Sequence, residues 1–296
     1  MRLIFIIMST TAIPTNTKWW GGGRSPFNAS YGKVMMWYFL MSDAFTFGAF
    51  LISYGTIRFS VNHWADPNQV FNSFPGFGHQ NLPLAFVSLM TFILIFSSVT
   101  MVLAVHEGHK MNRKGVEKYM ILTILGGLAF LGCQAWEWTH LLTGEHIAML
   151  GDGTLSVVPT TVKMNPWGAH VAHEQIATAL QATPHEKLVE IAGTLQHGAN
   201  LAAKSSSELI TMIQSSPDLH VNHTGPIAFG GYFFGITGFH GFHVFSGVVI
   251  NVVMWIKTRL GHFDQRGHYE MIEKAGLYWH FVDLVWVFVF LCFYLI

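Results

Sequence analysis

Residues 275–296 read AGLYWHFVDLVWVFVFLCFYLI and decide the fold class, because an apolar run of this length spans a bilayer as a helix. Two ionisable side chains, His280 and Asp283, lie inside this run. At about 1.5 Å per residue, Asp283 lies roughly 12 Å from the start of the run, near mid-membrane. A charge there costs at least about 2.5–3.5 kcal/mol. Residues three apart share a helix face, so we expect this face to contact protein.

The composition of the whole chain is typical of a polytopic membrane protein. Of its 296 residues, 51% are hydrophobic and 11% are charged, against about 25% charged residues in a typical soluble domain. The formal net charge is zero, which argues against nucleic acid as a partner. Cys133 and Cys292 both fall in predicted membrane helices and form no CxxC motif, so they do not indicate a redox compartment.

Four further segments are long and apolar enough to cross a membrane, and they cover roughly residues 34–57, 82–105, 119–142 and 227–256. Segment 82–105 carries no charge, which predicts a plain bilayer helix without a functional residue. Together with 275–296, these segments predict an all-α membrane protein built as a five-helix transmembrane bundle.

Lysine and arginine set the expected orientation. Twelve of the sixteen lie in the N-terminal arm, in 106–118 and in 257–274, which places those segments inside and the C-terminus outside. In a bacterium, this predicts a multi-pass protein of the inner (plasma) membrane with a periplasmic insert. We divide the chain into an N-terminal surface arm, transmembrane helices 1–3, an extramembrane insert and transmembrane helices 4–5, covering residues 1–33, 34–142, 143–225 and 226–296.

The insert, 143–225, contains no run long enough to span a membrane. Segments 183–186 and 205–208 both have the pattern of a capping box. Each precedes apolar residues at helical spacing, namely Leu188, Ile191 and Leu195, and Leu209, Ile210 and Ile213. We therefore predict two or three amphipathic helices. His170 and His173 are spaced as a metal pair, but a solvated helix face is favoured because no third ligand follows at a telling spacing.

Several ionisable side chains lie inside the predicted spans: Asp43, Glu137, His140, His240, His243, His280 and Asp283. Three interpretations of these side chains compete. The side chains form a proton or ion relay, they are ligands of haem or metal, or they make hydrogen-bonded contacts between helices or with lipid headgroups. From the residues alone, we rank the structural or lipid role first, the relay second and metal third.

Segment 227–256 is rich in glycine. Gly231 and Gly235 form a small-xxx-small pair that Gly238 and Gly241 extend, which predicts the close approach of another helix. We expect the face that carries His280 and Asp283 to lie against this helix and against the helix that carries Asp43.

Four stretches of the chain resemble subunit III of the haem-copper cytochrome c oxidases. GFHGFHV at 238–244 and YWHFVDLVW at 278–286 resemble the two most recognisable motifs of that family. FLMSDAFTFGAFLISY at 39–54 is similar to its carboxylate-bearing helix, and QAWEWTHLL at 134–142 resembles its helix with a buried glutamate. The resemblance covers all five predicted spans in order.

This resemblance implies an accessory subunit that holds no haem, copper or other metal of its own and packs beside the catalytic subunit, subunit I, which holds them. The whole complex would transfer electrons from cytochrome c to oxygen and pump protons. The accessory chain would stabilise the catalytic subunit, support its proton uptake and bind phospholipid.

The resemblance also implies roles for individual residues. Asp43 matches the family's membrane carboxylate, which is usually glutamate. Glu137 and Asp283 match further acidic positions. A set of residues expected to form a polar network or to contact lipid matches other positions of the motifs: His140, His240, His243, Glu273, Trp279 and His280.

Two departures from the family pattern matter. The longer family form has seven helices, so the other wall of its lipid cleft either comes from a partner chain here or is missing. The insert has no counterpart in the common form, and its helices suggest a docking surface for a cytochrome domain or another respiratory complex.

Two alternatives stay open: a haem-binding membrane anchor, and an ion or proton carrier using Asp43 and Asp283, although carriers usually show internal repeats.

Overall fold

The computed structural model describes residues 30–61, 64–65, 70–71, 84–159, 168, 171–195, 201–217 and 219–295. Most of the predicted arm and His170 lie outside these ranges. Five helices are long and apolar enough to cross a membrane: α1 (Tyr31–Ser60), α3 (Ala85–His109), α4 (Arg113–Thr143), α8 (Ile227–Arg259) and α10 (Glu270–Phe290), which η2 (Leu291–Leu295) continues as a π-helical turn. The predicted all-α bundle of five spans is confirmed.

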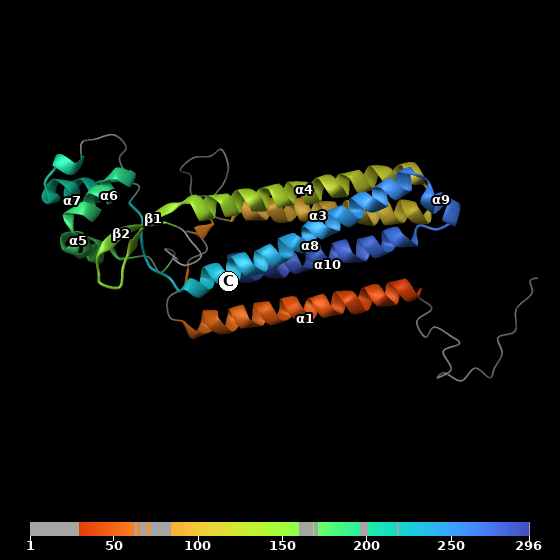
Figure 1. Cartoon of the computed structure of the whole chain (residues 1–296), viewed down its shortest axis with the longest axis horizontal. Helices are drawn as coiled ribbons and strands as arrows, with labels where there is room; N and C mark the ends of the chain where they lie inside the picture. The colour runs from red at the N-terminus through yellow and green to blue at the C-terminus, as the bar shows by residue number, and fades with distance from the viewer. Residues whose placement is uncertain are drawn as a thin grey trace, which may run out of the picture.

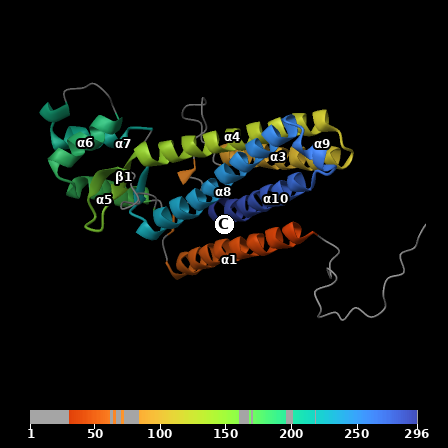
Figure 2. The same cartoon turned by 45° about the vertical axis from the view of Figure 1, so that its right-hand side comes forward.

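The five helices lie side by side along the long axis of the molecule (Figures 1 and 2). A tight turn joins α3 to α4, and the short helix α9 (His262–Arg266) joins α8 to α10. α1 lies along one edge of the bundle in both views. The insert lies at the opposite end from α9, and we refer to these as the insert end and the α9 end.

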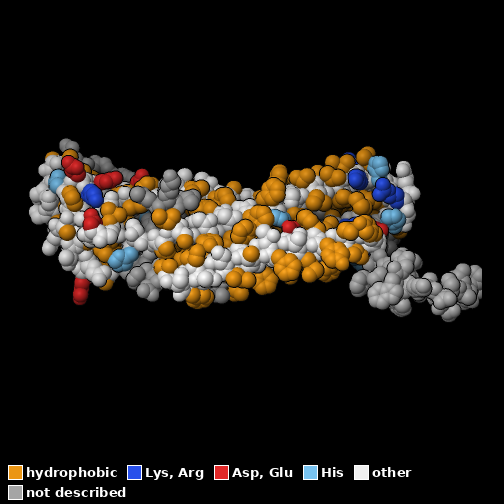
Figure 3. Space-filling view, turned by 60° about the horizontal axis from the view of Figure 1, so that its bottom comes forward, with side chains coloured by type: hydrophobic (Ala, Val, Ile, Leu, Met, Phe, Trp, Pro, Cys, Tyr) orange, Lys and Arg blue, Asp and Glu red, His pale blue; other side chains and the backbone are white. Residues whose placement is uncertain are grey.

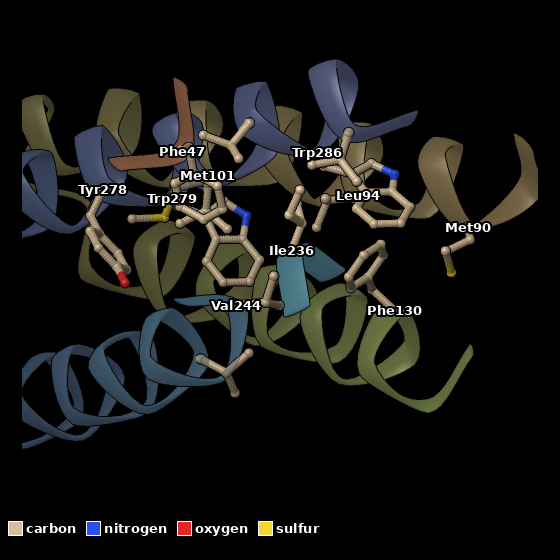
Figure 4. Close-up of a cluster of buried hydrophobic side chains, with 14 of the residues drawn as sticks. Phe47, Met90, Leu94, Met101, Phe130, Ile236, Val244, Tyr278, Trp279 and Trp286 are labelled. Atoms are coloured by element: carbon tan, nitrogen blue, oxygen red, sulfur yellow. The ribbon is translucent and has the colours of Figure 1, made fainter. Parts of the chain in front are cut away.

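Large aromatic side chains fill the centre of the bundle (Figure 4). Trp279 and Trp286 on α10 are almost fully buried. The ring of Trp286 meets that of Phe130 on α4 edge to face, with 4.8 Å between the ring centroids. Burial of such rings contributes much of the packing energy of a core. It also fixes α4 and α10 against each other.

The glycines that allow close packing agree only in part with those predicted. At Gly231 and Gly235, an added Cβ would meet no atom within 4 Å. At Gly238 and Gly241, which extend the predicted motif, it would lie 3.0 Å from Trp138 and 3.5 Å from Gln134, both on α4. Close approach also occurs at Gly127 on α4 and Gly247 on α8, where an added Cβ would lie 2.6 Å and 2.9 Å from Trp279. Spacing alone does not show which glycines face a bulky neighbour.

The insert forms its own small core beneath three helices, α5 (His173–Ala182), α6 (His185–Leu195) and α7 (Ser206–Gln214). The predicted helices correspond to α6 and α7, and the capping box at Ser205 and Glu208 is present. In the capping box predicted at 183–186, the Thr183 hydroxyl should accept a hydrogen bond from the first turn of α6. It instead accepts one from the Leu155 N–H and donates one to the Ala179 carbonyl.

A three-stranded sheet accompanies these helices, whereas the sequence predicted an insert made of helices alone. The strands are β1 (Glu145–Met149), β2 (Leu155–Pro159) and β3 (Val221–His223), in the order β2-β1-β3. β1 pairs antiparallel with β2 and parallel with β3, with Ile147 opposite Val221. Asp152 in the β1–β2 turn accepts bonds from the Thr154 N–H and hydroxyl, which lower the pKa of its carboxyl.

Candidate functional site

Polar side chains inside the bundle form several separate groups. The first joins α1 to α8: Asp43 Oδ2 lies 3.5 Å from His243 Nε2. Both side chains are largely buried, and Asp43 Oδ2 has no hydrogen-bond partner among the described residues. His243 Nδ1 donates to the Phe239 carbonyl, with 2.8 Å between the two atoms. That bond makes Nδ1 the nitrogen that carries the proton, and Nε2 faces Asp43.

Aromatic rings enclose this pair. The His243 imidazole lies edge to face with Phe47 and Phe239, at centroid distances of 5.3 and 4.6 Å. Tyr278 on α10 stacks on its other side and shares a 2.6 Å hydrogen bond with Ser246. Burial among these rings lowers the local dielectric, which strengthens any electrostatic interaction between Asp43 and His243.

His240 lies one helical turn before His243 but belongs to a different environment. Its side chain is fully buried, and Nε2 donates to the Val282 carbonyl across 3.1 Å. Phe130 and Trp286 pack around the ring. Because the bond reaches a backbone carbonyl of α10, His240 ties α8 to α10.

Glu137 on α4 is also fully buried. The Tyr294 hydroxyl, on η2, lies 3.2 and 3.1 Å from its two carboxyl oxygens and donates a hydrogen bond to the carboxylate. His140, three residues later, is exposed, so the predicted pairing of Glu137 with His140 on one face does not produce a shared site. Tyr294, which the sequence analysis did not single out, is the partner of Glu137.

His280 and Asp283 face α3 rather than α1 and α8, so the expected neighbours of this face were wrong. His280 Nδ1 lies 2.6 Å from the Ser98 hydroxyl oxygen, and Ser98 also hydrogen-bonds the Asp283 carboxylate. Segment 82–105 was predicted to be a plain bilayer helix. It instead supplies Ser98 here and Ser97, whose hydroxyl accepts a bond from Trp279 Nε1 across 3.1 Å.

Charged residues gather at the α9 end of the bundle, between α1, α3 and α10. Glu273 forms an ion pair with Lys33, and its Oε1 lies 3.2 Å from His109 Nε2. A groove of about 360 Å³ begins at these residues and runs along the bundle over apolar side chains and Gly276 as far as His280. Nearby, Tyr269 hydrogen-bonds Asp264, and burial raises the pKa of its hydroxyl. Glu273 thus lies at the charged mouth of an apolar groove.

Among the residues that the structure describes, no three His, Cys, Asp or Glu side chains come together as a metal site. His240 and His243 contact different elements, and His280 belongs to a third group. The arrangement therefore provides polar contacts between helices, a buried contact between the Asp43 carboxylate and the His243 imidazole, and a groove at the α9 end with polar and apolar lining.

Comparison with known proteins identifies relatives for these helices. The family described as "Cytochrome c oxidase subunit III" matches residues 209–296. The protein named "Cytochrome c oxidase subunit 3" of Marchantia polymorpha is 47% identical over 66 residues, 22% of this chain and 24% of that protein. Those of Prototheca wickerhamii and Felis catus are each 28% identical, over 64% of this chain and 73% of each relative. The chain thus spans about a quarter of the first relative and about three quarters of the other two.

Proposed function

Because the chain belongs to the cytochrome c oxidase subunit III family, we propose that it is a cofactor-free accessory subunit of a proton-pumping terminal oxidase. In this role it stabilises the catalytic subunit, binds lipid and supports proton uptake. The observation that carries the proposal is the contact between Asp43 and His243. In this proposal, Asp43 is the membrane carboxylate that the resemblance implies, and it lies beside His243 among aromatic rings.

The proposed placement of the chain follows its charges. The N-terminus and the α9 end lie on the inner side of a bacterial inner membrane, and the insert lies in the periplasm. The apolar surface between the two ends supports a span of the bilayer (Figure 3). The proposed insert, 143–225, has its own core and offers a surface outside the membrane for a cytochrome or another respiratory protein.

The groove at the α9 end supports the lipid-binding part of the proposal. Its mouth carries Lys33, His109 and Glu273, and its floor is apolar along Val102 and Leu277. A phospholipid has the matching chemistry, because its zwitterionic headgroup suits paired charges and its acyl chain suits an apolar floor. The haem and copper of the complex belong, in this proposal, to the catalytic subunit.

Affinity purification of the full-length chain from its native membrane tests the proposal. We expect the catalytic oxidase subunit to co-purify together with the visible spectrum of its haem. Recovery of the chain without any oxidase subunit, or a haem Soret band from the separated chain itself, would contradict it. The same purification from a chain lacking 145–222 examines the insert, whose proposed partner should be lost while the oxidase subunits remain.

Replacement of Asp43 is expected to affect turnover rather than cofactor content. In Asp43→Ala, His243 loses its carboxylate neighbour across the contact between α1 and α8. We expect faster loss of oxidase activity during turnover or less bound phospholipid, with the haem content per complex unchanged. Ser42→Ala, on the exposed side of α1, is the matched control. If lifetime and bound lipid stay at wild-type values, Asp43 has no role beyond packing.

A further inference from the structure

We propose that His109 makes the groove at the α9 end sensitive to pH, so that protonation of its imidazole lets the groove hold an anionic phospholipid in preference to a zwitterionic one. This inference deepens the lipid-binding part of the proposed function, on which it rests. The depth of the groove, the charges at its mouth and the exposure of His109 carry it.

The mouth of the groove lies where lipid headgroups lie. Lys33 is in the first turn of α1, His109 is the last residue of α3, and Glu273 is in the first turn of α10. From there the groove follows α10 to His280 and α3 to Val102. At about 1.5 Å per residue, both walls run roughly 10 Å along the bundle. A phospholipid fits with its headgroup at the mouth and an acyl chain along the apolar walls.

The charges at the mouth cancel while His109 is neutral. Lys33 pairs with Glu273, whose other carboxyl oxygen lies 3.2 Å from His109 Nε2. An imidazolium carries protons on both ring nitrogens, so protonated His109 donates from Nε2 to Glu273 whichever tautomer the neutral ring adopts. The mouth then has an excess of positive charge. That excess attracts an anionic headgroup, whereas balanced charges suit a zwitterionic one.

The helices and turns around His109 carry further titratable or charged side chains: His106, Glu107, Lys110, His268, Tyr269, Glu270, Lys274 and His280. Four of them form ion pairs, Glu107 with Lys110 and Glu270 with Lys274. His268 and Tyr269 line a neighbouring hollow. His280 lies at the deep end of the groove, where a charge is costly. Of the side chains at the mouth, histidine is the type whose charge changes between about pH 5 and 8.

His109 is also accessible to protons from water. Its side chain is 63% exposed, against 34% for Lys33 and 21% for Glu273. With the α9 end on the inner side of the membrane, as proposed above, acidification of the cell interior protonates His109. The lipid that the groove holds then changes from zwitterionic to anionic.

The lipid that stays bound to the purified full-length chain tests this inference. The chain is equilibrated at about pH 6 and at about pH 8, on either side of histidine titration, with micelles containing equal amounts of phosphatidylglycerol and phosphatidylcholine. Both headgroups keep their charge across this range, and mass spectrometry quantifies the bound lipids. We expect the ratio of bound phosphatidylglycerol to phosphatidylcholine to be about three- to tenfold higher at the lower pH, the effect of one added charge near a membrane surface. An equal ratio at both pH values would overturn the proposal.

Two substitutions fix the charge at position 109. His109→Lys stays positive and should keep the high ratio at both pH values, whereas His109→Ala should keep the low one. His106→Ala removes an exposed histidine of the same helix outside the groove lining, so it should show the wild-type change. A ratio that still changes with pH in His109→Ala would assign the effect to another group and overturn the proposal.

Glu273→Gln gives an independent measurement. It removes the negative charge at the mouth but keeps an oxygen that Lys33 can bond. The mouth then has an excess of positive charge even when His109 is neutral. We expect this variant to prefer phosphatidylglycerol at about pH 8, where histidine is largely neutral. A wild-type ratio in this variant would contradict the electrostatic argument.

The same measurement separates this inference from the proposed function. Phospholipid retained in a ratio that does not change with pH refutes the inference and leaves lipid binding intact. Leu277→Trp places a large ring in the groove lining. A wild-type chain that retains no more phospholipid than Leu277→Trp refutes lipid binding in the groove as well.

Discussion

Gly127→Ala is expected to lower the free energy of unfolding by about 1–3 kcal/mol, the usual cost of overpacking a core. The Cβ added to α4 would lie 2.6 Å from the Trp279 ring and 2.7 Å from Val248. Trp279 has little room to yield, because it is almost fully buried and its indole N–H bonds Ser97. The helices α4, α8 and α10 must therefore separate to admit one methyl group.

Gly132 on the same helix provides the matched control, because an added Cβ there meets no atom within 4 Å. Gly132→Ala should leave stability unchanged or raise it by up to about 1 kcal/mol, since alanine is the better helix former. Unfolding in mixed detergent micelles, followed by tryptophan fluorescence, measures both variants. Equal stability of the two variants would show that Trp279 does not fill the space beside Gly127.

Tyr294→Phe is expected to lower the free energy of unfolding by about 1–3 kcal/mol or more, since it leaves the fully buried Glu137 without its hydrogen-bond donor. The substitution removes one oxygen atom and preserves the ring packing against Phe71 and Phe233. The loss of stability therefore measures the effect of leaving the carboxylate unpaired rather than the effect of a cavity. Tyr232→Phe removes a hydroxyl that bonds Ser53 at a partly exposed site, and should cost less than 1 kcal/mol or so.

A double-mutant cycle isolates this interaction. Once Glu137→Leu has removed the buried carboxylate, Tyr294→Phe should cost much less than it does in the wild-type chain. The same micelle unfolding measurement applies to all four proteins of the cycle. Additive effects of the two substitutions would mean that Glu137 has another donor and that the contact with Tyr294 contributes little.

The sequence predicts the spans well because bilayer thickness sets the length of an apolar run and because such runs contain few charged residues. It predicts their neighbours poorly. The spacing of His280 and Asp283 shows that they share a face but not which helix that face meets, and the answer is α3. Ser98 went unnoticed because a serine barely changes the hydropathy of a span. Tyr294 was passed over because an aromatic residue near a membrane surface is common.

The sheet of the insert was missed for a related reason. Its strands are three to five residues long, too short for a clear alternation of apolar and polar residues. β1 and β3 also pair across the whole insert, with Met149 opposite His223, and such a long-range pairing leaves no local pattern. The amphipathic helices α6 and α7 were predictable because their spacing is local.

The pairing of β1 with β3 has a consequence for how such a chain arises. The chain enters the insert along β1 and leaves it along β3, and paired strands lie about 4.8 Å apart. Because the two strands are parallel, the exit at His223 lies beside Met149, about 13 Å along β1 from the entry at Glu145. A loop of about five residues could span that distance and join α4 to α8 in place of the insert. Because a loop can replace the insert, its gain or loss during evolution would leave the five membrane helices in place. The same site suits the genetic fusion of a reporter domain to the bundle.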